Sequence, residues 1–177
     1  MIAGAVAVMW LRQDRPGNDA CRFALIDDEL LIEGSTSETA GQFLHYRVRA
    51  AADGVTRRAR IGDVPMLTFE HEGDGRWMMN GIEVPEVRGA LDFDLGVTPA
   101  TNTLAIRRMN LAVGDSAEAV AAWLDPSDWM LKPLKQRYTR VSETEYDYAS
   151  DTGFSARLTV DEHGIVRDYP GWWKAQD

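Results

Sequence analysis

The segment that decides the fold is QFLHYRVRAAADGVTRRARI, residues 42–61. Its first arm, Gln42–Ala52, alternates between two sets of side chains. One face carries Phe43, His45, Arg47 and Arg49, and the other carries Leu44, Tyr46, Val48 and Ala50. A period of two residues is typical of a β-strand. Asp53-Gly54 follows at once, before a second extended arm, Val55–Ile61. Because Gly accepts the positive φ of a tight turn, the segment predicts a β-hairpin.

The same alternation recurs along the chain. The opening residues, Met1–Trp10, are interpreted as a strand because no Lys or Arg precedes the apolar run, as a secretory signal would require. The other predicted strands are Ala7–Arg12, Arg22–Ile26, Glu29–Thr36, Met66–Glu70, Arg76–Met79, Leu91–Leu95, Arg137–Val141, Glu145–Ala149, Phe154–Asp161 and Ile165–Tyr169. Short strands with few helices indicate a mainly β protein with one large antiparallel sheet. A sheet of about ten strands must curl, split or close, and we expect this one to curl.

Residues 106–124 have two interpretations. In the favoured one, Ile106–Val113 and Ser116–Leu124 form a hairpin around Gly114-Asp115. In the other, Ser116–Leu124 is a helix, because SAEAVAAWL is rich in good helix formers.

The length of 177 residues predicts a single domain, 1–177. Two stretches within it echo one another: Tyr46-x-Val48-x-Ala50 before Asp53-Gly54-Val55, and Phe154-x-Ala156-x-Leu158 before Asp161 and Gly164-Ile165. The echo hints at two similar half-sheets, although any two hairpins share such features.

Composition excludes several classes of protein. Apolar residues make up 45% and charged residues 27%, as in ordinary globular proteins. The net charge, 19 − 28 = −9, argues against nucleic acid as a partner. No apolar stretch approaches the ~18 residues of a membrane span. A lone cysteine, Cys21, excludes an intrachain disulfide. We therefore expect a soluble, cytoplasmic domain.

The sequence has few signals of catalysis. The three histidines, His45, His71 and His163, lie in separate segments without zinc-ligand spacing, and we interpret them as solvated surface residues. We interpret Cys21 as a buried small residue, since no paired motif supports a nucleophile. No Gly-x-Ser-x-Gly elbow or Gly-rich phosphate loop is present. The expectation is a protein without metal or cofactor that is not an enzyme.

Asp92 and Asp94 flank Phe93 and would share one face of a strand, roughly 6–7 Å apart by strand rise. Such a separation suits the paired carboxylates of a glycoside hydrolase. The alternative is that each pairs with an arginine, since Arg107-Arg108 lies just downstream, and pairing would lower both pKa values.

Aromatic residues are the other candidate for function. The chain has six tryptophans, at positions 10, 77, 123, 129, 172 and 173. Tryptophan and tyrosine suit sites where an apolar body meets a polar rim, as in lipid or sugar binding, and methionines add adaptable apolar lining. Ordinary core packing is the alternative for each of them.

Residues 92–108 read DFDLGVTPATNTLAIRR. The stretch Thr98-Pro99-Ala100-Thr101-Asn102-Thr103-Leu104, followed by Ile106-Arg107-Arg108, closely resembles the signature of the putative glycolipid-binding family, formerly a domain of unknown function. Further matching features lie in the expected order: Trp10, Leu31-x-Glu33-Gly34, Trp77, Asp92-x-Asp94-Leu95, Gln136-Arg137-Tyr138, Tyr146-x-Tyr148 and Asp161-x-x-Gly164-x-Val166-x-x-Tyr169-Pro170. The chain departs at Ala105, where the family commonly has proline.

The resemblance implies a bacterial protein with a curled, largely antiparallel sheet that forms an incomplete half-barrel with few short helices, similar to the lipoprotein-localisation carriers. It implies non-catalytic binding of an amphipathic small molecule, a lipid or glycolipid, in a concave apolar cavity. Burial contributes about 0.8 kcal/mol per CH₂ of an acyl chain. The expected ligand-binding residues are Asp92, Asp94, Thr101, Asn102, Arg107, Arg108, Gln136, Tyr138 and Trp77.

In this scheme Arg107 and Arg108 offer forked donors to a phosphate or carboxylate. On a strand the two would face opposite sides, so only one could point inward. Thr101, Asn102, Gln136 and Tyr138 could bind sugar hydroxyls. The competing interpretation is a buried polar network that fixes the loop, with Asp92 or Asp94 paired to an arginine. A hydrolase using Asp92 and Asp94, a protein-interaction scaffold and an edge-strand homodimer remain alternatives.

Overall fold

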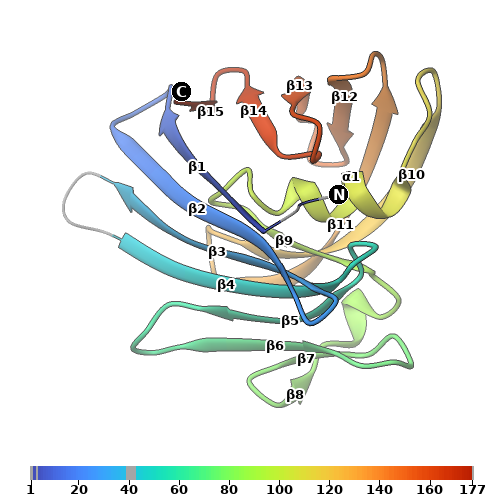
Figure 1. Ribbon diagram of the computed structural model, residues 1–177. Coiled ribbons are helices and arrows are strands. Elements are labelled where there is room, and N and C mark those ends of the chain that lie inside the picture. The colour runs from blue at the N-terminus through green and yellow to red at the C-terminus, as the bar shows by residue number, and fades with distance from the viewer. Residues whose placement is uncertain (1, 3, 39–42, 177) are drawn as a thin grey trace.

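The structure, a computed structural model, describes residues 2, 4–38 and 43–176. Met1, Ala3 and Gln42, which the predicted strands included, lie outside the described residues. Fifteen strands form one sheet (Figure 1). They are β1 (Ala5–Arg12), β2 (Gly17–Ile26), β3 (Glu29–Glu38), β4 (Phe43–Ala51), β5 (Thr56–Ile61), β6 (Leu67–His71), β7 (Trp77–Met79), β8 (Ile82–Glu83), β9 (Asp92–Leu95), β10 (Ser116–Asp125), β11 (Met130–Arg140), β12 (Glu145–Ser150), β13 (Ser155–Val160), β14 (Val166–Tyr169) and β15 (Trp173–Ala175).

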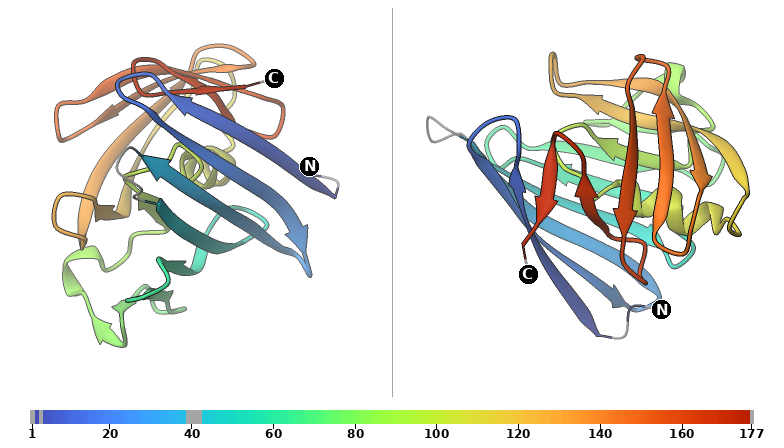
Figure 2. Two further views of the ribbon diagram at one scale, coloured as in Figure 1. Left: turned by 90° about the vertical axis from the view of Figure 1, so that its left-hand side faces the viewer. Right: turned by 90° about the horizontal axis from the view of Figure 1, so that it is seen from above.

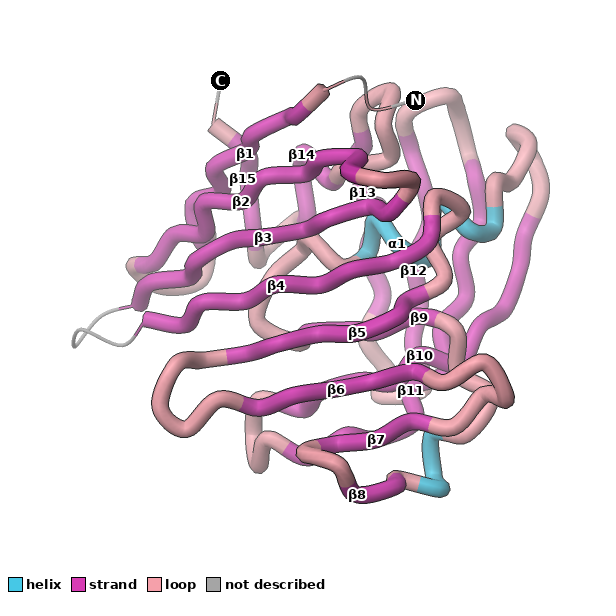
Figure 3. The backbone as a smooth tube through the Cα atoms, turned by 60° about the horizontal axis from the view of Figure 1, so that its bottom comes forward, coloured by secondary structure: helices cyan, strands magenta, loops and turns pink. Residues whose placement is uncertain are grey.

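The strand order is β8-β7-β6-β5-β4-β3-β2-β1-β15-β14-β13-β12-β11-β10-β9, so the sheet has two ends and is not closed. Every neighbouring pair is antiparallel except β9 and β10. Figures 1 and 3 show that β1–β8 form one wall, that β10–β14 curve round to face it, and that helix α1 (Asn102–Met109) lies between them. The prediction of a curled, incomplete antiparallel barrel is confirmed.

The prediction of a strand over Ile106–Val113 is wrong. Helix α1 spans Asn102–Met109, and it ends at Asn110, whose left-handed φ of 44° and N–H bond to the Ile106 carbonyl (3.2 Å) cap it. Leu, Ala, Arg and Met are good helix formers, and here they outweigh the alternation that suggested a strand. Because these residues are helical, the expectation that Arg107 and Arg108 face opposite sides of a strand is also wrong.

The alternative helix over Ser116–Leu124 is also wrong, because these residues form β10. The sequence pattern missed β8, β15 and the first half of β11. Proline at position 133 obscured β11. It is tolerated because β12 pairs with β11 only from Gln136 onward, so the missing N–H lies on a stretch with one partner strand.

Helix α1 is held between two hairpin turns. A side chain at Gly54, in the β4–β5 turn, would place its Cβ 2.5 Å from the Leu104 carbonyl oxygen. A side chain at Gly164, in the β13–β14 turn, would place its Cβ 3.1 Å from Ile106 Cγ2. Both glycines have positive φ, 103° and 78°. These are the turns of the two echoing segments, and each closes onto the same helix.

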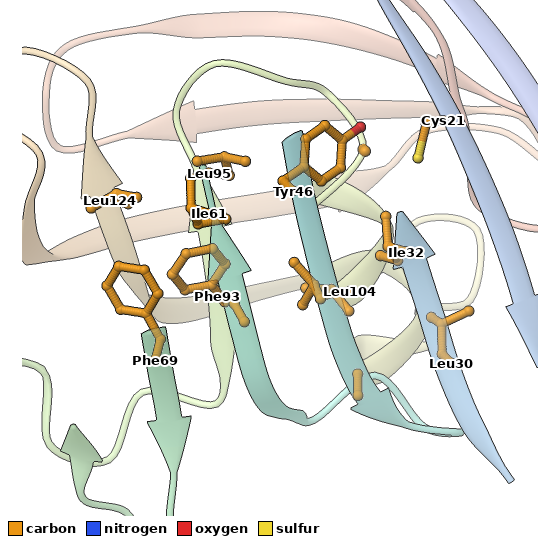
Figure 4. Close-up of a cluster of buried hydrophobic side chains, with 14 of the residues drawn as sticks. Cys21, Leu30, Ile32, Tyr46, Ile61, Phe69, Phe93, Leu95, Leu104 and Leu124 are labelled. Atoms are coloured by element: carbon orange, nitrogen blue, oxygen red, sulfur yellow. The ribbon is translucent and has the colours of Figure 1, made fainter. Parts of the chain in front are cut away.

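The concave face of the sheet is filled along most of its length. One large buried cluster joins both walls through residues such as Phe23, Phe93 and Leu104, each with no exposed surface. Figure 4 shows Phe69, Phe93, Leu104 and Ile32 arrayed along this face. Trp10 is also fully buried and donates its Nε1–H to the Val166 carbonyl at 2.7 Å. Helix α1 therefore acts as a plug, and the remaining hollow lies at one end of the sheet.

Gly34 on β3 allows Tyr46 on β4 to cross above it. An added Cβ would lie 2.5 Å from Tyr46 Cζ and 2.9 Å from the Ala20 carbonyl oxygen. We expect Gly34→Ala to lower the free energy of unfolding by about 2 kcal/mol or more in urea denaturation, because neither neighbour can move freely.

Gly73→Ala is the matched control, since nothing lies within 4 Å of its Cβ position. Its unfolding midpoint should stay close to that of the unmodified protein. Equal midpoints for the two variants would contradict the steric account.

Candidate functional site

A pocket of about 290 Å³ lies where the filled part of the sheet ends. Its lining comes from β9, the segment that follows it, the start of α1, strands β10, β11, β12, β14 and β15, and the β12–β13 and β14–β15 turns. The lining residues are Asp94, Gly96, Thr98, Asn102, Trp123, Leu134, Tyr148, Ser150, Thr152, Phe154, Tyr169, Trp172 and Trp173. The β12–β13 and β14–β15 turns contribute Thr152 and Trp172, which are exposed, whereas Thr98 and Asn102 are buried. The pocket thus has an aromatic mouth and a polar floor.

Aromatic rings form the walls of this pocket. Phe154 is central to them, with its ring centroid 5.7 Å from that of Trp172, 5.7 Å from that of Tyr169 and 6.2 Å from that of Tyr148. Its plane lies at 82° to Trp172, an edge-to-face contact of the kind aromatic pairs prefer. These residues come from three separate strand ends, so the sheet register assembles the wall.

Asp94 provides the only charged side chain among the residues that line the pocket. Gln136 Nε2 on β11 donates to Asp94 Oδ2 at 2.5 Å and also lies 3.2 Å from the Tyr148 hydroxyl oxygen. The Thr101 hydroxyl donates to Asp94 Oδ1 at 3.5 Å. Burial raises the pKa of Asp94 to about 6, and these two hydrogen bonds oppose the rise only in part.

A second buried carboxylate lies behind the floor. Asp19 on β2 accepts hydrogen bonds from the Tyr46 hydroxyl, at 2.9 and 3.0 Å, and from the Thr98 hydroxyl. The Ala100 N–H in turn donates to Thr98 Oγ1 at 3.0 Å. Asp19 has no exposed surface, and burial raises its pKa to about 6. This network fixes the segment that carries the pocket floor.

Five of the residues expected to bind ligand come together at the pocket floor or directly behind it. Asp94 and Asn102 line the pocket, and Thr101 and Gln136 hold Asp94. Tyr138, 1% exposed, accepts a hydrogen bond from Asn102 Nδ2 at 2.9 Å. Residues that the sequence separates by up to 44 positions are thereby joined in one cluster.

Asp92 and Arg108 lie together but away from the pocket lining. Arg108 Nε and Nη2 donate to the two carboxylate oxygens of Asp92 at 2.8 and 2.6 Å, a forked ion pair. Arg107 is not part of this pair and instead donates to the carbonyls of His163 (3.3 Å) and Ala52 (3.4 Å). The alternative that each aspartate pairs with an arginine therefore holds for Asp92 and not for Asp94.

Trp77 is a core residue in the structure. It has no exposed surface, donates its Nε1–H to the Ala90 carbonyl at 2.8 Å, and does not line the pocket. His71 stacks on it at 4.8 Å and contacts the Thr56 carbonyl at 2.8 Å through Nδ1. The interpretation of His71 as a solvated surface residue is therefore wrong. The side chain of His163 is 20% exposed, with its Nδ1 buried. His45 is exposed.

Sequence reasoning missed several residues of the site. Phe154 and Leu134 were not singled out as pocket residues, and Asp19 and Tyr46 were not recognised as a pair, because strand register alone joins them. The abundance of tryptophan was a valid signal for three residues of the wall, Trp123, Trp172 and Trp173. Cys21 is buried, as predicted.

Two further features concern metals and membranes. Among the described residues, no three His, Cys, Asp or Glu side chains come close enough to hold a metal ion. Within the same residues α1 is the one α-helix, and no helix is long and apolar enough to cross a membrane.

The fold and the site define a curled-sheet protein with an aromatic pocket, and its sequence and structure are similar to those of known proteins. The sequence profile of the family described as putative glycolipid-binding matches residues 7–175, and the chain belongs to this family. A crystal structure of a DUF1089 family protein from Pseudomonas aeruginosa is similar, with 29% identity and a TM-score of 0.68 over 98% of this chain and 93% of that one. No curated protein matches. The resemblance inferred from residues 92–108 is confirmed.

The Asp92–Arg108 pair should be structural. Asp92 is 2% exposed, so Asp92→Asn leaves a partly buried guanidinium without its counter-charge. We expect urea unfolding to show a loss of about 2 kcal/mol, below the full cost of breaking a buried pair because Arg108 is 19% exposed.

The matched control is Asp147→Asn, which removes an ion pair with Arg157 at an exposed position and should therefore change the free energy of unfolding much less. Similar losses in both variants would show that the Asp92 pair has no special structural role.

The raised pKa values of Asp19 and Asp94 predict a pH dependence of stability. Between about pH 4 and pH 6 the folded protein holds protons that the unfolded chain has released, so the free energy of unfolding falls as pH rises through this window. Asp19 contributes at most about 3 kcal/mol.

Urea titrations at several pH values measure this slope. The difference between the unmodified protein and Asp19→Asn should be steepest between pH 4 and 6. Parallel pH profiles for the two proteins would contradict the assignment.

Proposed function

We propose that this protein binds an amphipathic ligand, a glycolipid or related lipid, without catalysing its conversion. The head group enters the pocket and the alkyl chain leaves through the aromatic mouth. The observation that carries the proposal is the pocket itself, in which aromatic walls meet a floor of Asp94, Thr98 and Asn102. The description of the family supports the same class of ligand.

The chemistry of the lining suits a sugar-bearing head group. Ligand sites combine apolar walls with a few placed polar groups, and this lining has that composition. The apolar faces of a sugar ring can pack on rings such as Phe154 and Trp172, and its hydroxyls can reach the carboxylate and amide of the floor. Gly96 leaves space for this arrangement, because an added Cβ would lie 2.6 Å from Trp123 Nε1.

The size of the pocket limits what it encloses. At about 290 Å³ it lies at the lower end of the volumes typical of ligand sites. It suits a head group with the first carbons of a chain. The filled concave face leaves no room for a long acyl chain beside α1, so the chain must extend outward.

Exposed apolar side chains support that direction. On one side of the sheet, a row of turns joins successive antiparallel strands (Figure 2). We call this side the pocket end, and it comprises residues 13–16, 62–66, 80–81, 126–129, 151–154 and 170–172. Val64, Ile82 and Phe43 at this end are 96%, 73% and 61% exposed. Met66, Trp129, Met130 and Trp172 are exposed there too. Exposed apolar side chains at the end of the sheet that holds the pocket favour contact with a lipid surface.

The hydrolase alternative gains no support from the geometry. Paired-carboxylate hydrolysis requires two free carboxyl groups, one of them an acid. Asp92 is instead held by Arg108, and among the lining residues Asp94 is the one carboxyl group of the pocket.

Removal of one wall should weaken ligand binding. We expect Trp172→Ala to lower the affinity for octyl glucoside, used below its critical micelle concentration, by about tenfold in isothermal titration calorimetry. That loss corresponds to about 1.4 kcal/mol, within the range for burying part of an aromatic ring.

Val120→Ala is the control, since Val120 is 41% exposed, as is Trp172, but does not line the pocket. Its affinity should not change. If Trp172→Ala also binds with unchanged affinity, or if the unmodified protein binds no amphiphile, the proposed site is wrong.

A further inference from the structure

The one charged side chain among the residues that line the pocket is negative. Among its thirteen lining residues, Asp94 is the only ionisable acid or base other than the two tyrosines, and no Lys, Arg or His lines it. The donors to Asp94 are the neutral Gln136 and Thr101. Within the described part of the chain, no basic side chain pairs with this carboxylate, which therefore lacks a counter-charge when ionised.

The rings around Asp94 add to this negative potential. Tyr148 and Tyr169 meet at 73°, and Phe154 and Trp172 at 82°, so ring faces point in several directions around the hollow. An aromatic face carries partial negative charge and attracts cations, most strongly where water is excluded. A wall of differently oriented rings next to a carboxylate is the arrangement that binds organic ammonium groups.

Two arginines that contact residues beside or within the pocket lining are already engaged. Arg108 is paired with Asp92. Arg12 packs over Trp172 and Trp173, with its guanidinium carbon 5.5 and 4.8 Å from the ring centroids, and it is paired with Asp14 at 2.8 Å. Neither arginine lines the pocket, and neither is free to neutralise Asp94.

We infer that the head group taken by this pocket carries a positive charge, in the form of an organic ammonium group beside Asp94 and between the aromatic walls. The inference rests on the proposed function and names the class of its ligand, of which an amine-bearing sugar is one source and a quaternary ammonium another. It replaces the expectation that Arg107 and Arg108 capture a phosphate or carboxylate, because an anionic head group would meet Asp94 as a like charge.

Four octyl amphiphiles separate the alternatives: octylammonium, octyltrimethylammonium, octyl glucoside and octyl sulfate. Each is titrated calorimetrically into the full chain at pH 7.5, below its critical micelle concentration and in 0.15 M NaCl, which screens the net charge of the protein. At least one ammonium compound should bind tenfold or more tightly than the glucoside and the sulfate. A preference for the primary amine indicates direct pairing with Asp94, and a preference for the quaternary compound indicates the aromatic walls.

Asp94→Asn tests whether the preference arises at the pocket. It should bring the affinity for the ammonium compounds to within about threefold of that for octyl glucoside. Asp147→Asn changes the net charge equally at an exposed position and should leave the preference intact. Urea unfolding verifies that both variants are folded.

The outcomes separate the inference from the proposed function. Equal affinity for all four compounds, or tighter binding of the sulfate, overturns the cationic head group and leaves amphiphile binding standing. A preference that persists in Asp94→Asn also overturns the inference, because the carboxylate of Asp94 then has no part in it. Binding of none of the four by the unmodified protein overturns the proposed function.

Discussion

The hydrogen bonds that Thr98 and Tyr46 donate to Asp19 are the interaction on which the site depends. They join β2, β4 and the segment after β9 inside the curled sheet. A buried carboxylate is costly unless it is well hydrogen-bonded, and these two donors offset part of that cost. Because Thr98 is fixed, Asn102 and the start of α1 have a defined position, and Asp94 faces the pocket rather than solvent.

Helix α1 converts an open sheet into a packed molecule with one small pocket. Gly54 and Gly164 let two hairpin turns approach the helix from opposite walls, and its apolar face completes the core. A sheet that curls without such a plug would expose a long apolar trough. The plug confines ligand binding to one end and makes the site selective for a head group.

The hairpins were predictable from the sequence because local rules decide them. Alternation around Asp53-Gly54 fixes β4 and β5, and the register they adopt places Tyr46 inward, as the alternation requires. Residues 92–108 identified the family and, through Asp94, Thr101 and Asn102, part of the pocket floor. Helix α1 was missed because Gly114-Asp115 suggested a hairpin turn after Ile106–Val113, and packing in the concave face decides for the helix.

The rest of the site could not be predicted because it depends on contacts between distant strands. Phe154 and Trp172 meet only because β13, β14 and β15 are adjacent in the sheet, and nothing local marks their ring contact. The partner of Asp92 was predictable as an arginine. Asp94 instead accepts a hydrogen bond from Gln136. This partner could not be predicted because it depends on the register of β10 with β9 and with β11.

The central claim is that the pocket between the Thr98 segment and the aromatic walls receives the head group of an amphiphile. An NMR titration of the ¹⁵N-labelled protein with octyl glucoside tests it most directly. The account predicts that amide shift changes concentrate at Gly96, Ser150, Phe154 and Trp172. Changes confined to the convex face of the sheet, or an unchanged spectrum at saturating amphiphile, would contradict it.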